Sequence, residues 1–306
     1  MEATSKPFDL NDTKVLHLEL TTRCNAACPQ CARTDPNSGY HTDHELTLAR
    51  TCNLFSTEFV SQLDKMFACG NYGDPAAAQE CLEIFRWFRE VNPGITLGMN
   101  TNGGLRTKVW WQKLADVLHN PRDYAVFSID GLADTNHLYR RNVRWSSVIT
   151  NAECFIAAGG NAQWDMLVFE HNKHQVDDCR ELAKDMGFRR FRTKVSNRFD
   201  ERPVTGLSAP AEYQAPTEIT GDIRCHAVQE RSLYVAATGD VLPCCFIGSE
   251  IFKLDDTMHA WVQQPGYHDL VASWDNKPHR ICKKFCASAG THTRFTSQWQ
   301  EDTPLC

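Results

Sequence analysis

Strand and helix signals alternate from about residue 15 to about residue 197, and this alternation constrains the fold more than any other feature of the chain. Six short apolar segments are predicted as strands: 15–20, 66–69, 95–100, 125–129, 163–169 and 190–195. Four segments between them are predicted as helices: 75–91, 107–118, 146–158 and 175–186. Strands joined by helices pair in parallel. The sequence therefore predicts an α/β fold with a parallel sheet, either open and doubly wound or curved into a partial barrel.

Polar side chains on the first and last predicted strands favour the barrel. His17 and Glu19 alternate with leucines, and Arg190, Arg192 and Lys194 alternate with less polar residues. Parallel strands covered on both faces are normally apolar throughout, so this pattern indicates a polar lumen or a ligand. Exposed strand ends explain it equally well. The basic residues of the last strand also suit an anionic substrate group, although a solvated face is the simpler interpretation.

Composition and charge restrict the class of protein. The chain has 306 residues, a formal net charge of -6 and 14 cysteines. It has no broadly basic composition for nucleic acid, no apolar run long enough for a membrane span and no apolar signal core near the N-terminus. We therefore expect a cytoplasmic protein without nucleic-acid or membrane partners. In a reducing compartment its cysteines are metal ligands or core thiols rather than disulfides.

The chain is predicted to fall into two main parts. Residues 14–197 form the α/β part after an N-terminal extension at 1–13, and the aperiodic segment 198–221 is a linker to residues 222–306. In the last part, two β-rich runs flank Thr238-Gly239-Asp240, which predicts a hairpin. Five cysteines in the middle of the chain are predicted as core thiols: Cys52, Cys69, Cys81, Cys154 and Cys179.

Three cysteines follow the first predicted strand in the string CNAACPQC, at Cys24, Cys28 and Cys31. Three thiolates on one short loop can ligate three irons of a [4Fe–4S] cluster, which usually takes four cysteines. A local trio leaves one iron open to another ligand. A zinc site completed by His17 or His41 is the alternative.

This cysteine loop resembles that of the radical S-adenosylmethionine (SAM) enzymes, whose open iron binds SAM. The resemblance implies a partial (β/α)6 TIM-like barrel for residues 14–197. It also implies that Gly73, Asp74 and Pro75 correspond to the family's Gly-Gly-Glu-Pro motif and receive the amino group of SAM. Capping of the following helix by Asp74 is the simpler interpretation of this turn.

Two further strings, MNTNGG and FSIDG, place polar groups at the ends of the third and fourth predicted strands. Ligands of α/β folds bind at the carboxyl ends of parallel strands. The resemblance implies that Asn100, Ser128 and Asp130 contact the ribose and carboxylate of SAM, with Arg140 or Arg141 as a carboxylate clamp. Ordinary turn chemistry is the alternative. The chain departs from the family at Gln30, where an aromatic residue often packs near adenine.

Cysteines late in the chain predict a second site. A hairpin with thiols near its base, followed by the string CKKFC, resembles the twitch domain, a shorter relative of the SPASM domain. The resemblance implies one auxiliary [4Fe–4S] cluster with four ligands: Cys225, Cys244, Cys282 and Cys286. Zinc held by four cysteines is the alternative. Cys245 and Cys306 are left over, and either can replace one of the four.

The resemblance implies an enzyme in which the first cluster reductively cleaves SAM to a 5′-deoxyadenosyl radical. That radical abstracts a hydrogen atom from a small-molecule or peptide substrate, and the auxiliary cluster serves electron transfer or substrate positioning. An external electron donor such as flavodoxin or ferredoxin is implied as a partner. A glycyl-radical activase, an iron–sulfur electron carrier and a zinc-binding module are the other classes considered. For an epimerisation, Cys69, Cys245 and Cys306 are the thiols considered for returning a hydrogen atom.

Overall fold

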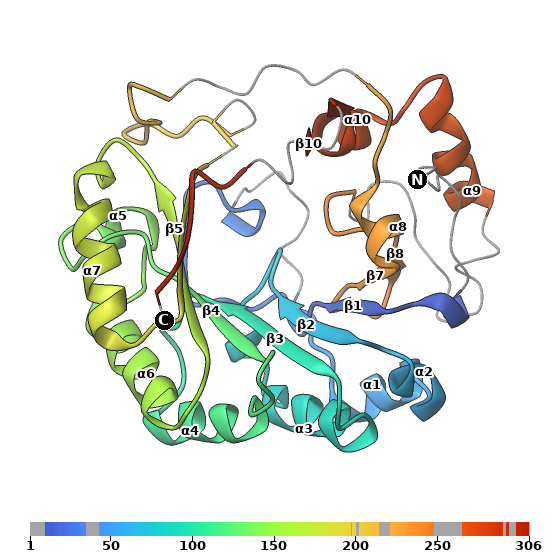
Figure 1. Ribbon diagram of the computed structural model, residues 1–306, viewed down its shortest axis with the longest axis horizontal. Coiled ribbons are helices and arrows are strands. Elements are labelled where there is room, and N and C mark those ends of the chain that lie inside the picture. The colour runs from blue at the N-terminus through green and yellow to red at the C-terminus, as the bar shows by residue number, and fades with distance from the viewer. Residues whose placement is uncertain are drawn as a thin grey trace.

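The computed structural model describes residues 10–34, 43–196, 198–199, 202–213, 221–247, 265–289, 292–293 and 298–305. Residues 1–9 of the predicted N-terminal extension and Cys306 lie outside these residues. Figure 1 shows a curved sheet with helices along its outer face and a smaller helical part beside one edge.

Six parallel strands form the centre of the sheet, in the same order as in the chain. Their bounds agree with the predicted strands to within about two residues: β1 (Val15–Leu18), β2 (Lys65–Cys69), β3 (Thr96–Thr101), β4 (Tyr124–Ser128), β5 (Ala162–Val168) and β6 (Arg190–Val195). Every neighbouring pair from β1 to β6 is parallel. The prediction of a parallel α/β sheet is confirmed.

Helices connect these strands and cover the outer face of the sheet (Figure 1). They are α1 (Leu48–Leu54), α2 (Thr57–Ser61), α3 (Cys81–Val91), α4 (Lys108–Val117), α5 (Asn136–Tyr139), α6 (Trp145–Ala157) and α7 (Val176–Met186). Short 3-10 turns are η1 (Leu10–Asp12), η2 (Ala32–Thr34), η3 (Pro75–Ala77) and η4 (Lys173–Gln175). Helix α7 ends at Gly187, which has the left-handed φ of 87° expected of a terminating glycine.

The predicted helix at 75–91 is wrong in its first turn. Asp74 caps only the turn η3, and Ala78 then takes an extended conformation before α3 begins at Cys81. The reason is a contact from another part of the chain. Arg106 donates hydrogen bonds to the carbonyl oxygens of Ala76 (2.6 Å) and Ala78. These carbonyls are satisfied by a guanidinium, so the chain does not need to continue as a helix.

The main core lies between the sheet and its outer helices. Trp111 of α4 packs against Phe127 of β4, with ring centroids 5.1 Å apart, and Phe155 of α6 lies beside both. Rings of this size remove large apolar areas from water and dominate core energetics. On the inner face, His17 and Glu19 are 6% and 1% exposed. The polar positions of β1 therefore face the interior of a partial barrel and not solvent.

The last part of the chain adds strands to both edges of this sheet. β7 (Ser232–Val235) pairs in parallel with β1, and β8 (Val241–Leu242) follows it through the predicted hairpin. β11 (Glu301–Pro304) pairs antiparallel with β6 at the opposite edge. The result is a nine-stranded sheet in the order β11-β6-β5-β4-β3-β2-β1-β7-β8. The boundary at residues 221 and 222 stays a prediction, since strands beyond it belong to the same sheet.

A second, smaller core lies beside the β7 edge. It is formed by α8 (His226–Glu230), α9 (Pro265–Ala272), η7 (Ser273–Asp275) and α10 (Arg280–Cys286), with a short pair of strands, β9 (Ser288–Ala289) and β10 (His292–Thr293). Its buried apolar residues include Leu270 and Trp274. None of the helices among the described residues has the length and apolar character needed to cross a membrane.

Candidate functional site

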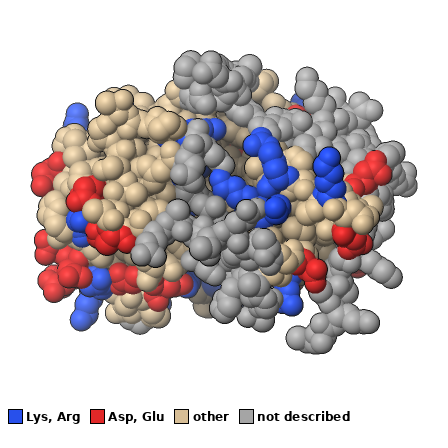
Figure 2. Space-filling view, turned by 90° about the horizontal axis from the view of Figure 1, so that it is seen from above, with Lys and Arg blue, Asp and Glu red and all other residues tan. Residues whose placement is uncertain are grey.

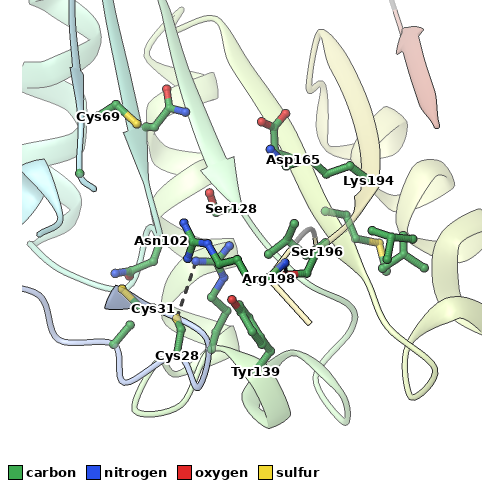
Figure 3. A pocket seen from close by; sticks show the side chains of 18 of the residues that line it. Cys28, Cys31, Cys69, Asn102, Ser128, Tyr139, Asp165, Lys194, Ser196 and Arg198 are labelled. Atoms are coloured by element: carbon green, nitrogen blue, oxygen red, sulfur yellow. Dashed lines mark hydrogen bonds between the residues drawn. The ribbon is translucent and has the colours of Figure 1, made fainter. Parts of the chain in front are cut away.

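A cavity of about 650 Å³ opens at the carboxyl ends of the parallel strands. Its wall combines the cysteine loop, the turn after β2 and the ends of β3 to β6 with two later segments, around residues 210–213 and 298–300. Its volume lies within the range of about 300–1,000 Å³ that is usual for small-molecule sites. Figure 3 shows side chains converging on it from several strands.

The three cysteines of the loop line one end of this cavity. Cys28 is 7% exposed, and Cys24 and Cys31 are half-buried. Tight turns hold the loop: the amide of Cys31 donates to the Cys28 carbonyl (3.0 Å), and the Thr34 hydroxyl donates to the same carbonyl (2.7 Å). Backbone hydrogen bonds and η2 therefore fix the backbone of the loop, and all three cysteines line the cavity.

The protonation of these thiols depends on burial and on nearby cations. Burial raises the pKa of Cys24 to about 12. Burial also raises the pKa of Cys28, while Arg140, whose Nη1 lies 3.8 Å from the sulfur, opposes the rise. Because the thiolate is the metal ligand, a metal that binds here must displace these protons. The donor set fits an iron–sulfur cluster with three cysteine ligands.

The turn after β2 is held by a buried carboxyl group. Glu19 accepts hydrogen bonds from the amides of Tyr72 (2.6 Å) and Gly73 (3.2 Å), and its other oxygen accepts one from the Tyr234 hydroxyl. Burial raises the pKa of Glu19 to about 7. A side chain at Gly73 would place Cβ 1.9 Å from the Thr21 carbonyl oxygen. The turn therefore requires glycine and lies directly against the strand that precedes the cysteine loop.

Asp74 is buried at the end of this turn and accepts hydrogen bonds from the turn itself and from the end of β3. Its carboxylate accepts hydrogen bonds from the amide of Ala76 (2.9 Å), the amide of Asn102 (2.7 Å) and the Thr101 hydroxyl (2.9 Å). The carboxylate thus caps η3 and joins the turn to the end of β3. Gly73 and Asp74 line the cavity, and Pro75 begins η3 behind them. The carbonyl groups of the turn are acceptors of the kind that an ammonium group requires.

The predicted strand-end residues divide into two groups. Asn100 and Ser128 line the cavity at the ends of β3 and β4. Asp130 is fully buried behind the wall, where it accepts hydrogen bonds from Arg140 Nε (2.6 Å) and the Leu167 amide (2.7 Å). Burial alone would lower the pKa of Arg140, but the Asp130 carboxylate outweighs it and raises the pKa. Asp130 thus positions Arg140, which is the member of this pair that reaches the cavity.

Gln30 has a structural role that explains the departure at this position. Its side chain is fully buried, accepts a hydrogen bond from the Ser196 hydroxyl (2.7 Å) and donates to the Arg202 carbonyl (3.3 Å). Arg198 donates in turn to the Gln30 carbonyl (3.1 Å). The cysteine loop is therefore tied to the segment that follows β6. Described residues of the predicted linker form part of the cavity wall, while the linker assignment itself stays a prediction.

Several cavity residues lie outside the predicted SAM and cluster sites. Asn102 lies 3.6 Å from the Cys24 sulfur through its amide nitrogen. Asp165 of β5 and Lys194 of β6 form the wall away from the cysteine loop (Figure 3). Trp299 also lines the cavity, with its ring centre 4.6 Å from Lys194 Nζ. The alternation of polar residues on the last predicted strand had indicated that Lys194 faces a polar lumen or a ligand. No local pattern placed Trp299, because it reaches the cavity through the pairing of β11 with β6.

The four predicted auxiliary ligands lie around one small apolar pocket. Cys225, Cys244, Cys282 and Cys286 all line it, together with Leu270 and Trp274. A hydrogen bond from Cys286 lowers the pKa of Cys225, and burial raises the pKa of Cys244 to about 11. Among the residues that the structure describes, no three or more His, Cys, Asp or Glu side chains gather as ligands of one metal ion. Four thiols in an apolar pocket fit the donor set of a [4Fe–4S] cluster.

The mid-chain cysteines do not all behave as core thiols. Cys81 and Cys179 are buried as predicted and Cys154 is half-buried, but Cys52 is exposed on α1, so the prediction is wrong there. Cys69, at the end of β2, lines the cavity instead of the core, and burial raises its pKa to about 12. The hairpin places Cys245 near this position, since Asn71 donates a hydrogen bond to the Cys245 carbonyl (3.2 Å).

No protein-family profile and no curated protein matches the chain. Solved structures do. SuiB of Streptococcus suis, bound to S-adenosylmethionine, is 15% identical over 85% of this chain and 68% of SuiB, with a TM-score of 0.61. The protein anSMEcpe, with AdoMet and the Cp18Cys peptide, is 17% identical over 92% of each chain, with a TM-score of 0.60. BtrN, with AdoMet and 2-DOIA, is 13% identical over 95% of this chain and 98% of BtrN, with a TM-score of 0.52.

At these identities the likeness shows the fold. It confirms the predicted fold class, an α/β partial barrel followed by a smaller C-terminal part.

Proposed function

We propose that this chain, which shares the fold of radical SAM enzymes, is itself an enzyme that cleaves SAM to modify a small molecule or a peptide. One observation carries the proposal: Cys24, Cys28 and Cys31 share a single cavity with the Gly73-Asp74 turn and the ends of β3 and β4. A cluster ligated by the three thiols would supply one electron to split SAM into methionine and a 5′-deoxyadenosyl radical.

The surrounding residues have separate binding tasks in this proposal. Arg140, fixed by Asp130, presents a guanidinium near the cysteine loop for the carboxylate of SAM. The carbonyl groups of the turn at Gly73 accept hydrogen bonds from its amino group. Asn100 and Ser128 offer polar groups to the ribose. A ligand bound in this cavity would be partly shielded from water.

The pocket around Cys225 is the proposed site of an auxiliary [4Fe–4S] cluster. Its support is the convergence of four cysteines from α8, the hairpin and α10 on an apolar pocket. Apolar walls restrict solvent access and so influence the reduction potential of such a cluster. The adjoining hairpin carries Cys245, whose carbonyl is bonded to the turn at Asn71. Electron transfer or substrate positioning is therefore its proposed role.

The substrate class rests on the neighbours and on cavity size. SuiB has been solved with the precursor peptide SuiA, anSMEcpe with a peptide and BtrN with 2-DOIA. These partners belong to those proteins, and they support either a peptide or a small molecule here. An electron donor such as flavodoxin or ferredoxin remains a proposed partner.

The proposal is tested by anaerobic reconstitution followed by iron analysis and incubation with SAM and dithionite. Wild-type protein should hold about eight irons, as two four-iron clusters require, and should form 5′-deoxyadenosine. A variant with Cys24, Cys28 and Cys31 all changed to alanine should retain about four irons and form none. A variant with Cys225 and Cys286 changed to alanine should lose about four irons.

The control variant is Cys52→Ala with Cys154→Ala, which removes thiols outside both sites. It should match wild type in iron content and deoxyadenosine formation. Zinc in place of iron, or iron without any SAM cleavage, would contradict the proposal and favour a binding module or an electron carrier.

A further inference from the structure

The end of the cavity away from the cysteine loop has an ammonium group in its wall. Lys194 lies on the inner face of β6, and Figure 3 shows it near Asp165, apart from Cys28 and Cys31. The charged groups that act on it most strongly are Asp165, Arg198 and Arg192. Lys194 therefore belongs to the part of the cavity beyond the proposed SAM site.

The contacts of Lys194 leave a donor for a ligand. Its Nζ donates a hydrogen bond to Gln298 Oε1 (3.0 Å), and it lies 4.6 Å from the centre of the Trp299 indole ring. The ring is shared with Arg192, whose guanidinium lies 4.0 Å from its centre. An ammonium has three donors. One is used by Gln298 and one side faces the indole, so a donor remains toward the cavity.

Carboxylates in this wall already have partners of their own. Both oxygens of Asp165 accept hydrogen bonds from Arg192, each at 2.7 Å. Glu212 pairs with Lys173 at 2.9 Å. Among the described residues, no carboxylate lies within ion-pair distance of Lys194. The group of Asp165, Arg192 and Lys194 thus carries one uncompensated positive charge.

An uncompensated charge in an enclosed wall is costly unless an opposite charge binds it. The surface seen from above is also positively charged near its middle. Figure 2 shows Lys and Arg side chains gathered there, with acidic side chains toward the margins. Arg198, which lines the same cavity, adds a second positive charge near Lys194, so this wall attracts an anionic group. A carboxylate oxygen can accept the single donor that Lys194 leaves toward the cavity.

We propose that Lys194, Gln298 and Trp299 form the subsite for a carboxylate of the substrate, an inference that rests on the proposed function. The planar indole keeps the ammonium in place, and Gln298 fixes its direction. The substrate would then lie between this anchor and the cysteine loop, within the same cavity as SAM. The carboxylate belongs either to a small acid or to an acidic side chain of a peptide.

The subsite is tested by protection of Lys194 from acetylation in the reconstituted wild-type protein with excess SAM and no reductant. Brief treatment with acetic anhydride is followed by peptide mass spectrometry. The probes are N-acetylalanine, its amide and methyl phosphate. The acid should protect Lys194 at concentrations about tenfold lower than the amide, the ratio expected for one charge-assisted hydrogen bond. A capped alanine peptide with one central glutamate, and its glutamine counterpart, tests the peptide source in the same way.

Lys65 is the internal control, because its Nζ also lies near aromatic rings (5.0 Å from Phe67 and Tyr124) but outside the cavity. No probe should protect it. Equal protection of Lys194 by acid and amide, or no protection by either acid, overturns the subsite. Stronger protection by methyl phosphate overturns the assignment to a carboxylate, and protection by SAM alone assigns Lys194 to SAM. The experiment needs no SAM cleavage, so its failure is distinguishable from failure of the proposed function.

Discussion

Glu19 shows how one buried side chain joins three parts of the molecule. It directly follows β1, holds the turn after β2 through two amides and accepts a hydrogen bond from Tyr234 of β7. The cause of its raised pKa is burial, which disfavours the charged form. A buried acid of this kind makes the stability of the fold depend on pH.

Replacing Glu19 with glutamine should flatten that dependence. Folding raises the pKa of this carboxyl from 4.5 to about 7. Its stabilising contribution is therefore full below about pH 4.5 and is lost as the pH rises through about 7. Between about pH 5 and about pH 8, wild type should lose about 2.5 kcal/mol of unfolding free energy relative to Glu19→Gln. Urea unfolding of the reconstituted proteins at several pH values measures it, and parallel pH curves would contradict it.

Gly73→Ala should weaken SAM binding through the backbone. The new Cβ would lie 1.9 Å from the Thr21 carbonyl oxygen, so the turn must move. Moving the proposed acceptors of the SAM amino group should raise the dissociation constant for SAM by about tenfold or more. Equilibrium dialysis with the reconstituted protein measures this. Gly94→Ala is the matched control, since a Cβ added there would lie 3.8 Å from its nearest neighbour, Asn92 Oδ1. Equal effects on SAM binding at both positions would rule out the explanation.

The sequence indicated which residues belong to the site better than it indicated what each side chain does there. The cysteine trio and the strand-end positions were recognisable because their chemistry is local. The distinction between Asp130, which supports the wall, and Arg140, which reaches the cavity, depends on which side of the strand end each side chain occupies. The internal hydrogen bonds of Asp74 and Gln30 depend on partners 27 to 172 positions away in the chain.

At the scale of elements, the amino ends of the strands are fixed by a buried ion pair. Arg89 of α3 donates to the carbonyls of Pro93 (2.9 Å) and Ile95 (2.6 Å) and to the Asp123 carboxylate. Asp123 is fully buried and also accepts a hydrogen bond from the Leu97 amide (2.8 Å). The pair joins α3, β3 and the start of β4 at the end of the barrel opposite the cavity.

Arg89→Met should therefore reduce stability without changing ligand affinity. Removing one partner of a buried pair leaves an uncompensated charge and costs about 3–5 kcal/mol. The dissociation constant for SAM should stay within about twofold. Arg86→Met, in the same helix, removes an exposed pair with Glu83 (3.6 Å) and should cost less than about 1 kcal/mol. Urea unfolding and SAM binding test both variants, and similar stability losses would disprove the assignment.

The elements themselves were largely predictable, with instructive exceptions. All six parallel strands were found because apolar runs and flanking turns are properties of short segments. The break between η3 and α3 was not found, because it depends on Arg106 satisfying the carbonyls of Ala76 and Ala78. Helices α1 and α2 were also missed, although Thr47 and Ser56 cap them. Short helices carry too few periodic positions to stand out in sequence.

For the whole molecule, the main unpredicted feature is that the last part of the chain closes both edges of the sheet. The hairpin around Gly239 was predicted, but its parallel pairing with β1 was not. The pairing of β11 with β6 was not predicted either. Such contacts join residues more than 100 positions apart and leave no local pattern. They explain how Trp299 comes to lie in the cavity wall.

Deleting residues 300–306 should destabilise the whole sheet. The deletion removes backbone hydrogen bonds such as that from the Gln300 amide to Thr193 (2.8 Å) and that from the Leu305 amide to Arg189 (3.0 Å). At about 1 kcal/mol each, the lost ladder should cost about 3 kcal/mol or more. Asp302→Ala removes only the partly exposed pair with Arg190 and should cost less than about 1 kcal/mol. Urea unfolding compares them, and a deletion no worse than the single substitution would refute this role.

The late closure of both edges also sets an order of events during synthesis. β6 can pair at its outer edge only after β11 has been synthesised, about 110 residues further along the chain. At translation rates of about 5–20 residues per second, this interval is roughly 5–20 s. Throughout it, the edge of β6 lacks its partner, and the edge of β1 also lacks one until β7 has been made. Unpaired strand edges are templates for wrong pairing between chains. The yield of correctly folded protein should therefore depend on how the cell shields the edge of β6 until β11 has been made.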